Sequence, residues 1–124
     1  MRILVTGSAG RLAQTLLPRL CASPEVDHVV GIDLNPTRFA HPRLTAHRLD
    51  TRSPAIAHHM NGCDAVIHLA FVVMRGALGR RRHDRAWIRD INLNGSVNVF
   101  RCAVRQGVHH LIHLSSAAVY GSWP

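Results

Sequence analysis

The sequence contains no lysine, so all 15 of its basic residues are arginine. This absence excludes a phosphate-binding lysine of the Walker A type, Schiff-base chemistry and any acid/base pair that depends on lysine. The longest unbroken apolar run, Leu69–Met74, has six residues, whereas a helix that spans a bilayer needs roughly 18. We therefore expect no membrane association. Because a strand-like run takes the place of a signal peptide, we expect a cytoplasmic protein.

Cysteine is also scarce. Cys21, Cys63 and Cys102 lie far apart and form no CxxC pair. This spacing predicts neither a disulfide framework nor a zinc site, and the three residues are interpreted as reduced and mostly buried. The adjacent histidines at 58–59 and 109–110 point apart on a helix or strand, so neither pair predicts a metal site. No metal is expected.

The formal net charge is +8, and part of it lies in an arginine cluster at Arg80, Arg81, Arg82 and Arg85. A solvated basic face is our first interpretation of this cluster. Contact with a substrate diphosphate and binding of a nucleic acid remain open as alternatives. Aromatic residues make up 5% of the chain and are not interleaved with the arginines, so the platforms for base stacking are few. We do not expect a nucleic-acid partner.

Apolar runs alternate with helical patterns over a length and composition typical of one soluble domain, residues 1–124. Such alternation predicts parallel strands joined by right-handed crossovers. The spacing of Leu12, Leu16, Leu17 and Leu20 predicts a helix that Pro18 should bend or weaken. Further helices are predicted at residues 53–60 and at Asp84–Gln106. The predicted strands are Ile3–Val5, His28–Ile32, Leu44–Leu49, Asp64–Val73 and Val108–Leu114.

A glycine-rich turn follows the first strand, in the segment MRILVTGSAGRLA at residues 1–13. Gly7 and Gly10 have the spacing of a dinucleotide-binding turn, where missing side chains allow a close approach to a pyrophosphate. The helix N-terminal amides of Gly10, Arg11 and Leu12 would face that anion. Ala13 replaces the third glycine, an accepted variant because this position serves helix packing.

Asp33 ends the second strand. A carboxylate at this place accepts hydrogen bonds from the ribose hydroxyls of NAD and repels the 2′-phosphate of NADP. Arg38 is the competing feature, since an arginine nearby would accommodate that phosphate. We predict NAD as the cofactor.

Taken in order, these motifs resemble the extended short-chain dehydrogenase/reductases, the family of NAD-dependent epimerases and dehydratases. TGSAGRLA looks like the family's TGxxGxxG turn, and Asp50 and Thr51 look like its adenine-contacting pair. The resemblance further implies a cofactor-lining role for Leu69, Ala70 and Phe71, in a segment similar to HLAA. Phe71 departs from the usual alanine there. Asn92, in NLNGSVNVF, is similar to the asparagine of NVxGTxNV and completes the expected cofactor-binding set.

SSAAVYG, at residues 115–121, resembles the family's SSxxVYG and gives Ser116 the place of the catalytic serine or threonine. The family's YxxxK pair is missing, since Tyr120 is the single tyrosine and belongs to VYG. The resemblance thus implies an α/β Rossmann-type parallel sheet in the order 3-2-1-4-5, truncated relative to the family.

We expect the NAD-binding portion of an oxidoreductase that resembles nucleotide-sugar epimerases and dehydratases, inactive by itself. The alternative is a noncatalytic module that responds to a dinucleotide. Leu111, Ile112 and Leu114 would lack a neighbouring strand, which favours self-association, including a homodimer. His68 and His113 are interpreted as hydrogen-bonded core residues rather than bases.

Overall fold

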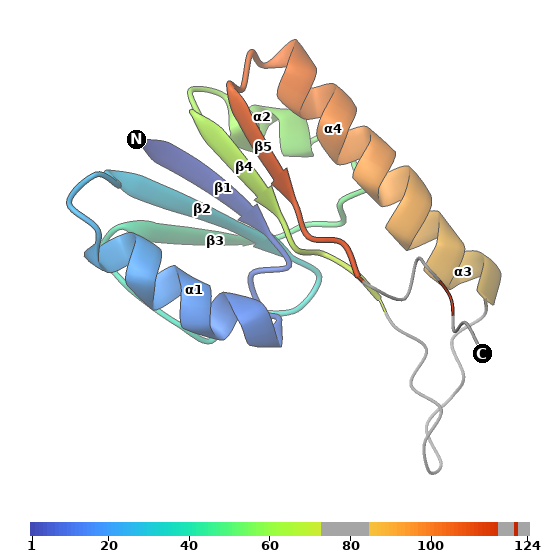
Figure 1. Ribbon diagram of the computed structural model, residues 1–124, viewed down its shortest axis with the longest axis horizontal. Coiled ribbons are helices and arrows are strands. Elements are labelled where there is room, and N and C mark those ends of the chain that lie inside the picture. The colour runs from blue at the N-terminus through green and yellow to red at the C-terminus, as the bar shows by residue number, and fades with distance from the viewer. Residues whose placement is uncertain (73–84, 117–120, 122–124) are drawn as a thin grey trace, which may run out of the picture.

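The computed structural model describes residues 1–72, 85–116 and 121. Within them, five parallel strands form one sheet in the order β3-β2-β1-β4-β5 (Figure 1). This order confirms the predicted Rossmann-type topology. The strands are β1 (Arg2–Thr6), β2 (His28–Asp33), β3 (Leu44–Arg48), β4 (Ala65–His68) and β5 (His110–His113).

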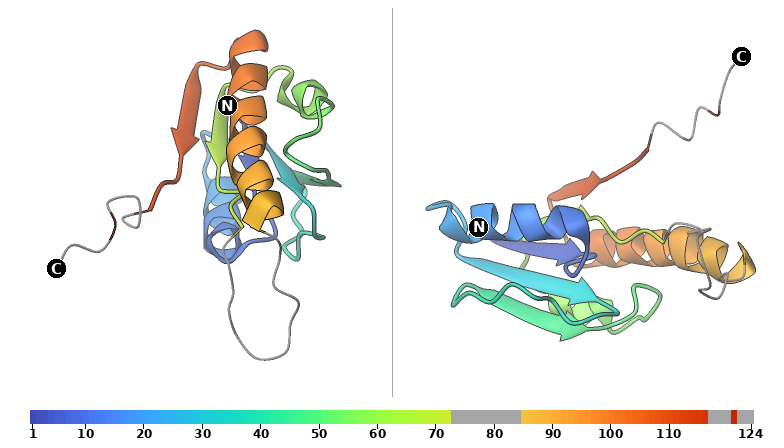
Figure 2. Two further views of the ribbon diagram at one scale, coloured as in Figure 1. Left: turned by 90° about the vertical axis from the view of Figure 1, so that its right-hand side faces the viewer. Right: turned by 90° about the horizontal axis from the view of Figure 1, so that it is seen from below.

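Helices cover both faces of the sheet (Figure 2). Helix α1 (Arg11–Ala22) packs on one face, where the side chains of Ile3, Val5 and Ile67 join Ala13 and Leu17 in one apolar cluster. Alternate residues of the same strands point to the other face, as the period of a strand requires. There they pack on α2 (Ile56–Met60) and α4 (Gly95–Arg105), in a cluster whose larger members are Leu4, Ile32, Ile56, Met60 and Val99.

The long predicted helix is divided. Its described part comprises α3 (Arg85–Arg89), the π-helical segment η1 (Asp90–Asn94) and α4. The periodicity of the sequence could not reveal the wider turn, because apolar spacing hardly changes over a single turn. Helix α1 runs through Pro18 without ending there.

The predicted fourth strand is too long. Strand β4 ends at His68, and residues 69–72 leave the sheet to cross the turn after β1. Val73 and Asp84, the outer limits of two predicted elements, lie outside the described residues.

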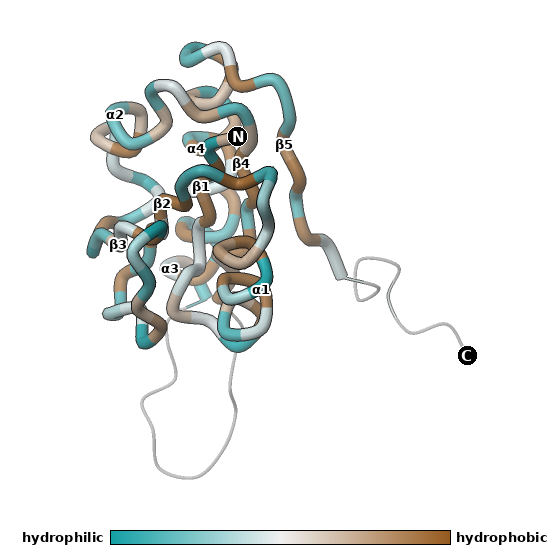
Figure 3. Tube along the Cα trace, turned by 90° about the vertical axis from the view of Figure 1, so that its left-hand side faces the viewer, coloured by the Kyte–Doolittle hydropathy of each residue, from teal (hydrophilic) through white to brown (hydrophobic). Residues whose placement is uncertain are grey.

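Strand β5 forms one edge of the described sheet, and all four of its residues are exposed. Figure 3 shows brown, apolar positions along β5 as well as in the interior strands. Leu111, Ile112 and Leu114 are exposed hydrophobic residues. The expected open edge is therefore present in the described part of the chain.

Candidate functional site

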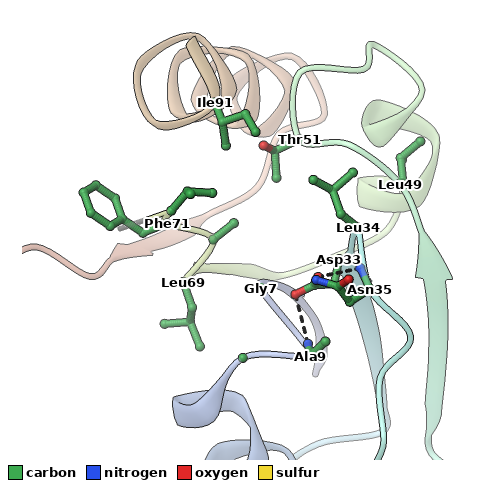
Figure 4. Close-up of a pocket in the computed structure, with 13 residues that line it drawn as sticks. Gly7, Ala9, Asp33, Leu34, Asn35, Leu49, Thr51, Leu69, Phe71 and Ile91 are labelled. Carbon is green, nitrogen blue, oxygen red and sulfur yellow. Dashed lines mark hydrogen bonds between the residues drawn. The ribbon is translucent and has the colours of Figure 1, made fainter. Parts of the chain in front are cut away.

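A cavity of about 240 Å³ opens where β1, β2 and β4 reach their carboxyl ends (Figure 4). Strand β1 pairs with β2 on one side and with β4 on the other, so the strand order reverses at this point. Ligands of open α/β sheets bind in such crevices. The lining residues predicted from sequence are Gly7, Gly10, Asp33, Thr51, Leu69, Ala70 and Phe71; the others are Ala9, Leu34, Asn35, Leu49, Val72 and Ile91.

Gly7 begins the turn after β1 with φ +74°, a conformation that favours glycine. A Cβ atom at this position would lie 2.8 Å from both the Ala70 nitrogen and the Leu69 carbonyl carbon. Two hydrogen bonds hold the turn against β2 and close it: the Gly7 N–H donates to the Ile32 carbonyl (2.8 Å), and the Gly10 N–H donates to the Gly7 carbonyl (2.9 Å). The missing side chain therefore lets two loops of the cavity touch.

Asp33 faces the cavity from the end of β2. One carboxylate oxygen accepts the Ala9 N–H (3.0 Å) and the other accepts the Asn35 N–H (2.8 Å), as the dashed lines in Figure 4 show. Each oxygen has further lone pairs with which it can accept another hydrogen bond. The carboxylate is thus oriented by the backbone while it stays able to bind hydroxyl groups.

Helix α1 starts directly after the glycine-rich turn. Its N-cap residue is Gly10, and no side chain in the described part of the molecule caps it. The first backbone N–H groups of a helix have no partner inside the helix and favour an anion. Arg11 and Leu12 carry these groups, although their exposed side chains do not line the cavity.

The segment that follows β4 forms the opposite wall. Asn92 on η1 binds it in two ways, since its side-chain oxygen accepts the Val72 N–H and its side-chain nitrogen donates to the Val72 carbonyl, both at 2.8 Å. Asn92 therefore holds this wall in place through two hydrogen bonds and is not itself a lining residue. Phe71 lines the cavity, but the residue is 61% exposed and its ring is turned away from Asp33 in Figure 4.

Asp50 lies beside the cavity rather than in its lining. Arg52 binds this carboxylate (2.6 Å) and also pairs with Asp90 on η1, which ties the loop after β3 to the long helix. The hydrogen bonds from Arg52 lower the pKa of Asp50. The pKa of Asp90 is lowered by hydrogen bonds from Asn94 and then from Arg52.

Thr51 is buried and lines the cavity from the same loop. A Cβ atom on Gly95 would lie only 2.6 Å from the Thr51 hydroxyl oxygen, so helix α4 approaches the loop closely. Gly95 has no predicted role from the sequence, although an isolated glycine inside a helical pattern is a recognised signal of close packing.

His68 is a buried residue (1% exposed) with hydrogen bonds on both ring nitrogens, which confirms the interpretation made from its sequence. The same interpretation is wrong for His113. That residue lies on the exposed edge strand β5, and its ring stacks on His68 with a centroid distance of 5.3 Å. The error arose because an apolar run does not reveal whether a further strand covers it.

Ser116 is exposed, follows β5 and is not part of the cavity lining. Tyr120 lies outside the described residues, as do Arg80, Arg81 and Arg82. Among the described residues of this motif, Ser116 is therefore not placed in the cavity that the glycine-rich turn lines.

Sequence reasoning missed several lining residues, including Leu34, Leu49 and Ile91. The first two flank predicted strand ends, so their position at the carboxyl edge was an available signal. Ile91 lies within the long predicted helix, and helical periodicity does not show which residues of an apolar face reach past the sheet.

Among the described residues, no group of three or more His, Cys, Asp or Glu side chains is placed to hold a metal ion. Within the same ranges, no helix combines the length and apolarity required to cross a membrane.

The strand order, together with the glycine-rich turn at the point of reversal, defines a Rossmann-type domain. The sequence model of the NAD-dependent epimerase/dehydratase family matches residues 3–124. The chain belongs to this family.

One curated relative is "Uncharacterized protein 052L" of Frog virus 3 (isolate Goorha), which is 31% identical over 98% of this chain and 34% of its own length. Among solved structures, uronate dehydrogenase from Agrobacterium tumefaciens is 27% identical with a TM-score of 0.77, over 93% of this chain and 40% of that one. MoeE5 in complex with UDP-glucuronic acid and NAD is 25% identical with a TM-score of 0.81, and the match covers 100% of this chain and 40% of MoeE5. The chain thus spans 34% to 40% of the length of these proteins.

Proposed function

We propose that residues 1–124 form one NAD-binding domain, the dinucleotide-binding portion of an epimerase/dehydratase-type oxidoreductase. One observation carries this proposal: the side-chain-free turn at Gly7 and the carboxylate of Asp33 border one cavity at the strand-order reversal. Membership of the family and the NAD-containing complex of a similar structure support it.

The residues present fit this cofactor. The space at Gly7, which a Cβ atom would fill, suits a phosphate-binding turn, and the N–H groups of Arg11 and Leu12 suit the pyrophosphate. Asp33 would bind the ribose hydroxyls. Leu34, Leu49 and Thr51 offer a wall for the adenine ring, with Asp50 beside it. When bound, NAD would accept or return a hydride.

The preference for NAD over NADP is testable through Asp33. A hydrogen bond to a charged group contributes about 1.5 to 3 kcal/mol, so Asp33→Ala should weaken NAD binding about tenfold or more. Calorimetric titration of both dinucleotides gives the measurement, and Arg38→Ala is the control for the competing cation that the sequence indicates. Equal or tighter binding of NADP by the unaltered chain would contradict the assignment.

We further propose that the chain alone does not turn over substrate. Its sequence has no lysine and its single tyrosine, Tyr120, lies in the VYG motif, so the acid/base pair of the family lacks candidates. That assistance is worth roughly 100- to 10,000-fold in rate. The substrate proposed for a complete enzyme is a nucleotide-sugar, hydrogen-bonded by Ser116; support comes from the UDP-glucuronic acid in a similar structure.

An assay with NAD and a panel of nucleotide-sugars tests this point, with NADH absorbance and product stereochemistry as readouts. Turnover above about 1 per second would contradict the proposal. NAD binding without turnover is also the behaviour of a noncatalytic dinucleotide-responsive module. A conformational response to NAD in a partner-free solution, measured by scattering, would favour that second candidate.

Self-association, including a homodimer, is proposed from the open edge at β5. A cytoplasmic location is proposed from the three free, buried cysteines, whose thiol pKa values burial raises. Light scattering tests the first proposal.

A further inference from the structure

A series of hydrogen bonds made by side chains crosses the core beneath the cavity wall. The His68 ring joins β4 to two neighbours: its Nδ1 lies 2.6 Å from the Thr6 hydroxyl of β1, and its Nε2 lies 2.9 Å from the Ser96 hydroxyl of α4. The Ser96 hydroxyl also forms a hydrogen bond with the Asn92 carbonyl (2.6 Å). The Ala70 N–H donates a hydrogen bond to the Thr6 hydroxyl oxygen (3.3 Å).

The direction of every hydrogen bond in this series follows from counting protons. The Asn92 carbonyl can only accept, so the single Ser96 hydroxyl proton is donated to it. Ser96 must then accept from His68, which places the ring proton on Nε2. Nδ1 of the neutral ring accepts the Thr6 hydroxyl proton, and the Thr6 oxygen is left to accept the Ala70 N–H. One tautomer of His68 therefore satisfies the whole series.

The series begins and ends at the same wall of the cavity. Ala70, at one end, and Val72, held by the Asn92 side chain at the other, both line the cavity. Ala70 also lies against Gly7, whose missing side chain makes room for it. The position of His68 is thus linked to residues 70–72 through β1 and through the long helix.

We propose that His68, fixed in the Nε2-protonated tautomer, is a positioning residue that sets the cavity wall at residues 70–72 for dinucleotide binding. This inference rests on the proposed NAD-binding function. His68 does not line the cavity, so its action passes through Thr6 and Ser96. It differs from a catalytic residue, which would contact the ligand.

The surroundings of His68 favour one protonation state. Phe100 meets the ring edge-on at a centroid distance of 5.7 Å, and His113 stacks on it from β5. Burial, and secondarily His113, lowers the pKa of His68 to about 4. His68 stays neutral near pH 7, which the proton count above requires.

The first test is the tautomer itself, measured on the ¹⁵N-labelled 124-residue chain by long-range proton–nitrogen correlation spectra. We expect a protonated Nε2 and an unprotonated Nδ1 on His68 at pH 7. A protonated Nδ1, or two tautomers in exchange, would overturn the proposal. This readout needs no cofactor.

The second test uses Ser96→Ala, which removes the acceptor for His68 without altering any lining residue. NAD affinity should fall roughly three- to tenfold, the effect of losing one hydrogen bond. The amide protons of Ala70 and Val72 should exchange faster with solvent. Ser96→Thr keeps the hydroxyl and should restore both properties.

Thr45→Val is the matched control, because it breaks another threonine–histidine pair, the exposed hydrogen bond between Thr45 of β3 and His28 of β2 (2.9 Å). It should change neither NAD affinity nor exchange at Ala70. If the unaltered chain binds NAD and Ser96→Ala matches it in affinity and exchange, the positioning role is refuted and the proposed function stands. If the unaltered chain does not bind NAD, the proposed function fails, and the tautomer and the exchange rates still decide the role of His68.

Discussion

Strands β4 and β5 are neighbours with similar sequences and opposite surroundings. AVIH in β4 is buried at all four positions, whereas HLIH in β5, paired with it residue by residue, is exposed at all four. Strand β4 has a strand on each side, while in the described part of the molecule β5 pairs with β4 alone. Burial here is decided by neighbouring elements rather than by residue type.

The candidate site lies among the buried strands, on the side of β4 rather than of β5. Its cavity uses the ends of β1, β2 and β4, whose strands are all packed on helices. Ser116 follows the exposed strand and lies away from that lining. The proposed binding of a dinucleotide and the chemistry expected of Ser116 thus depend on regions with different packing.

The largest effect should come from Gly7→Ala in the candidate site. The φ of +74° would cost about 1 to 2 kcal/mol with a side chain present, and the contact with residues 69 and 70 would add about 1 to 3 kcal/mol. We expect NAD binding to be lost and stability to fall in urea denaturation. Gly62→Ala is the control, since Gly62 has φ +69° and nothing within 4 Å of the added atom. Equal losses in both variants would refute the importance of the contact.

The next effect is the pH dependence of stability that His68 causes, where β4 meets β5. His68 has an ordinary pKa of 6.5 when unfolded and about 4 when folded. Between these values the unfolded chain binds more protons, so the free energy of unfolding falls as pH decreases from 6.5 to 4. The total contribution is roughly 3 kcal/mol. Among the described residues, Thr6, Ser96, Phe100 and His113 face the ring, and His113 is the ionisable side chain in this set.

Urea denaturation at several pH values, compared with His68→Asn, measures this contribution. Much of the slope between pH 6.5 and 4 should vanish in the variant, while His59, whose pKa is lowered mainly by burial, keeps a smaller share. Asp50 and Asp90 have lowered pKa values and titrate below this window. Identical slopes for the two proteins would contradict the prediction.

The smallest effect is expected on the exposed strand and tests the contrast directly. Ile67 (9% exposed) and Ile112 (57% exposed) are register partners of the same residue type. Ile67→Ala should lower stability by about 2 kcal/mol, whereas Ile112→Ala should change it by about 0.5 kcal/mol or less. Ile112→Ala should also reduce self-association in light scattering. Similar losses for both would show that β5 is covered in solution.

The sequence contained enough to predict the strand order and most of the cavity lining. The sequence allowed the prediction of Gly7, Gly10 and Asp33, because a dinucleotide-binding turn requires these residue types at a recognisable spacing. Asn92 was found through its motif, although its contact with Val72 depends on a loop whose path the sequence does not specify. His113 was misassigned because burial depends on neighbouring elements.

The π-helical segment Asp90–Asn94 limits how the length of this chain can vary. A π turn holds more residues than an α turn, and such segments occur mostly as single widened turns inside α-helices. One residue inserted or deleted next to this segment, between Asn94 and Ser96 at the start of α4, would rotate the preceding part by about 100° relative to the rest of α4. Ile91 and Asn92 could then no longer meet the cavity and Val72 while Ser96 meets His68. A substitution on this helix changes contacts at one position. A one-residue insertion or deletion at this place would instead separate the cavity wall from the hydrogen bonds that hold it.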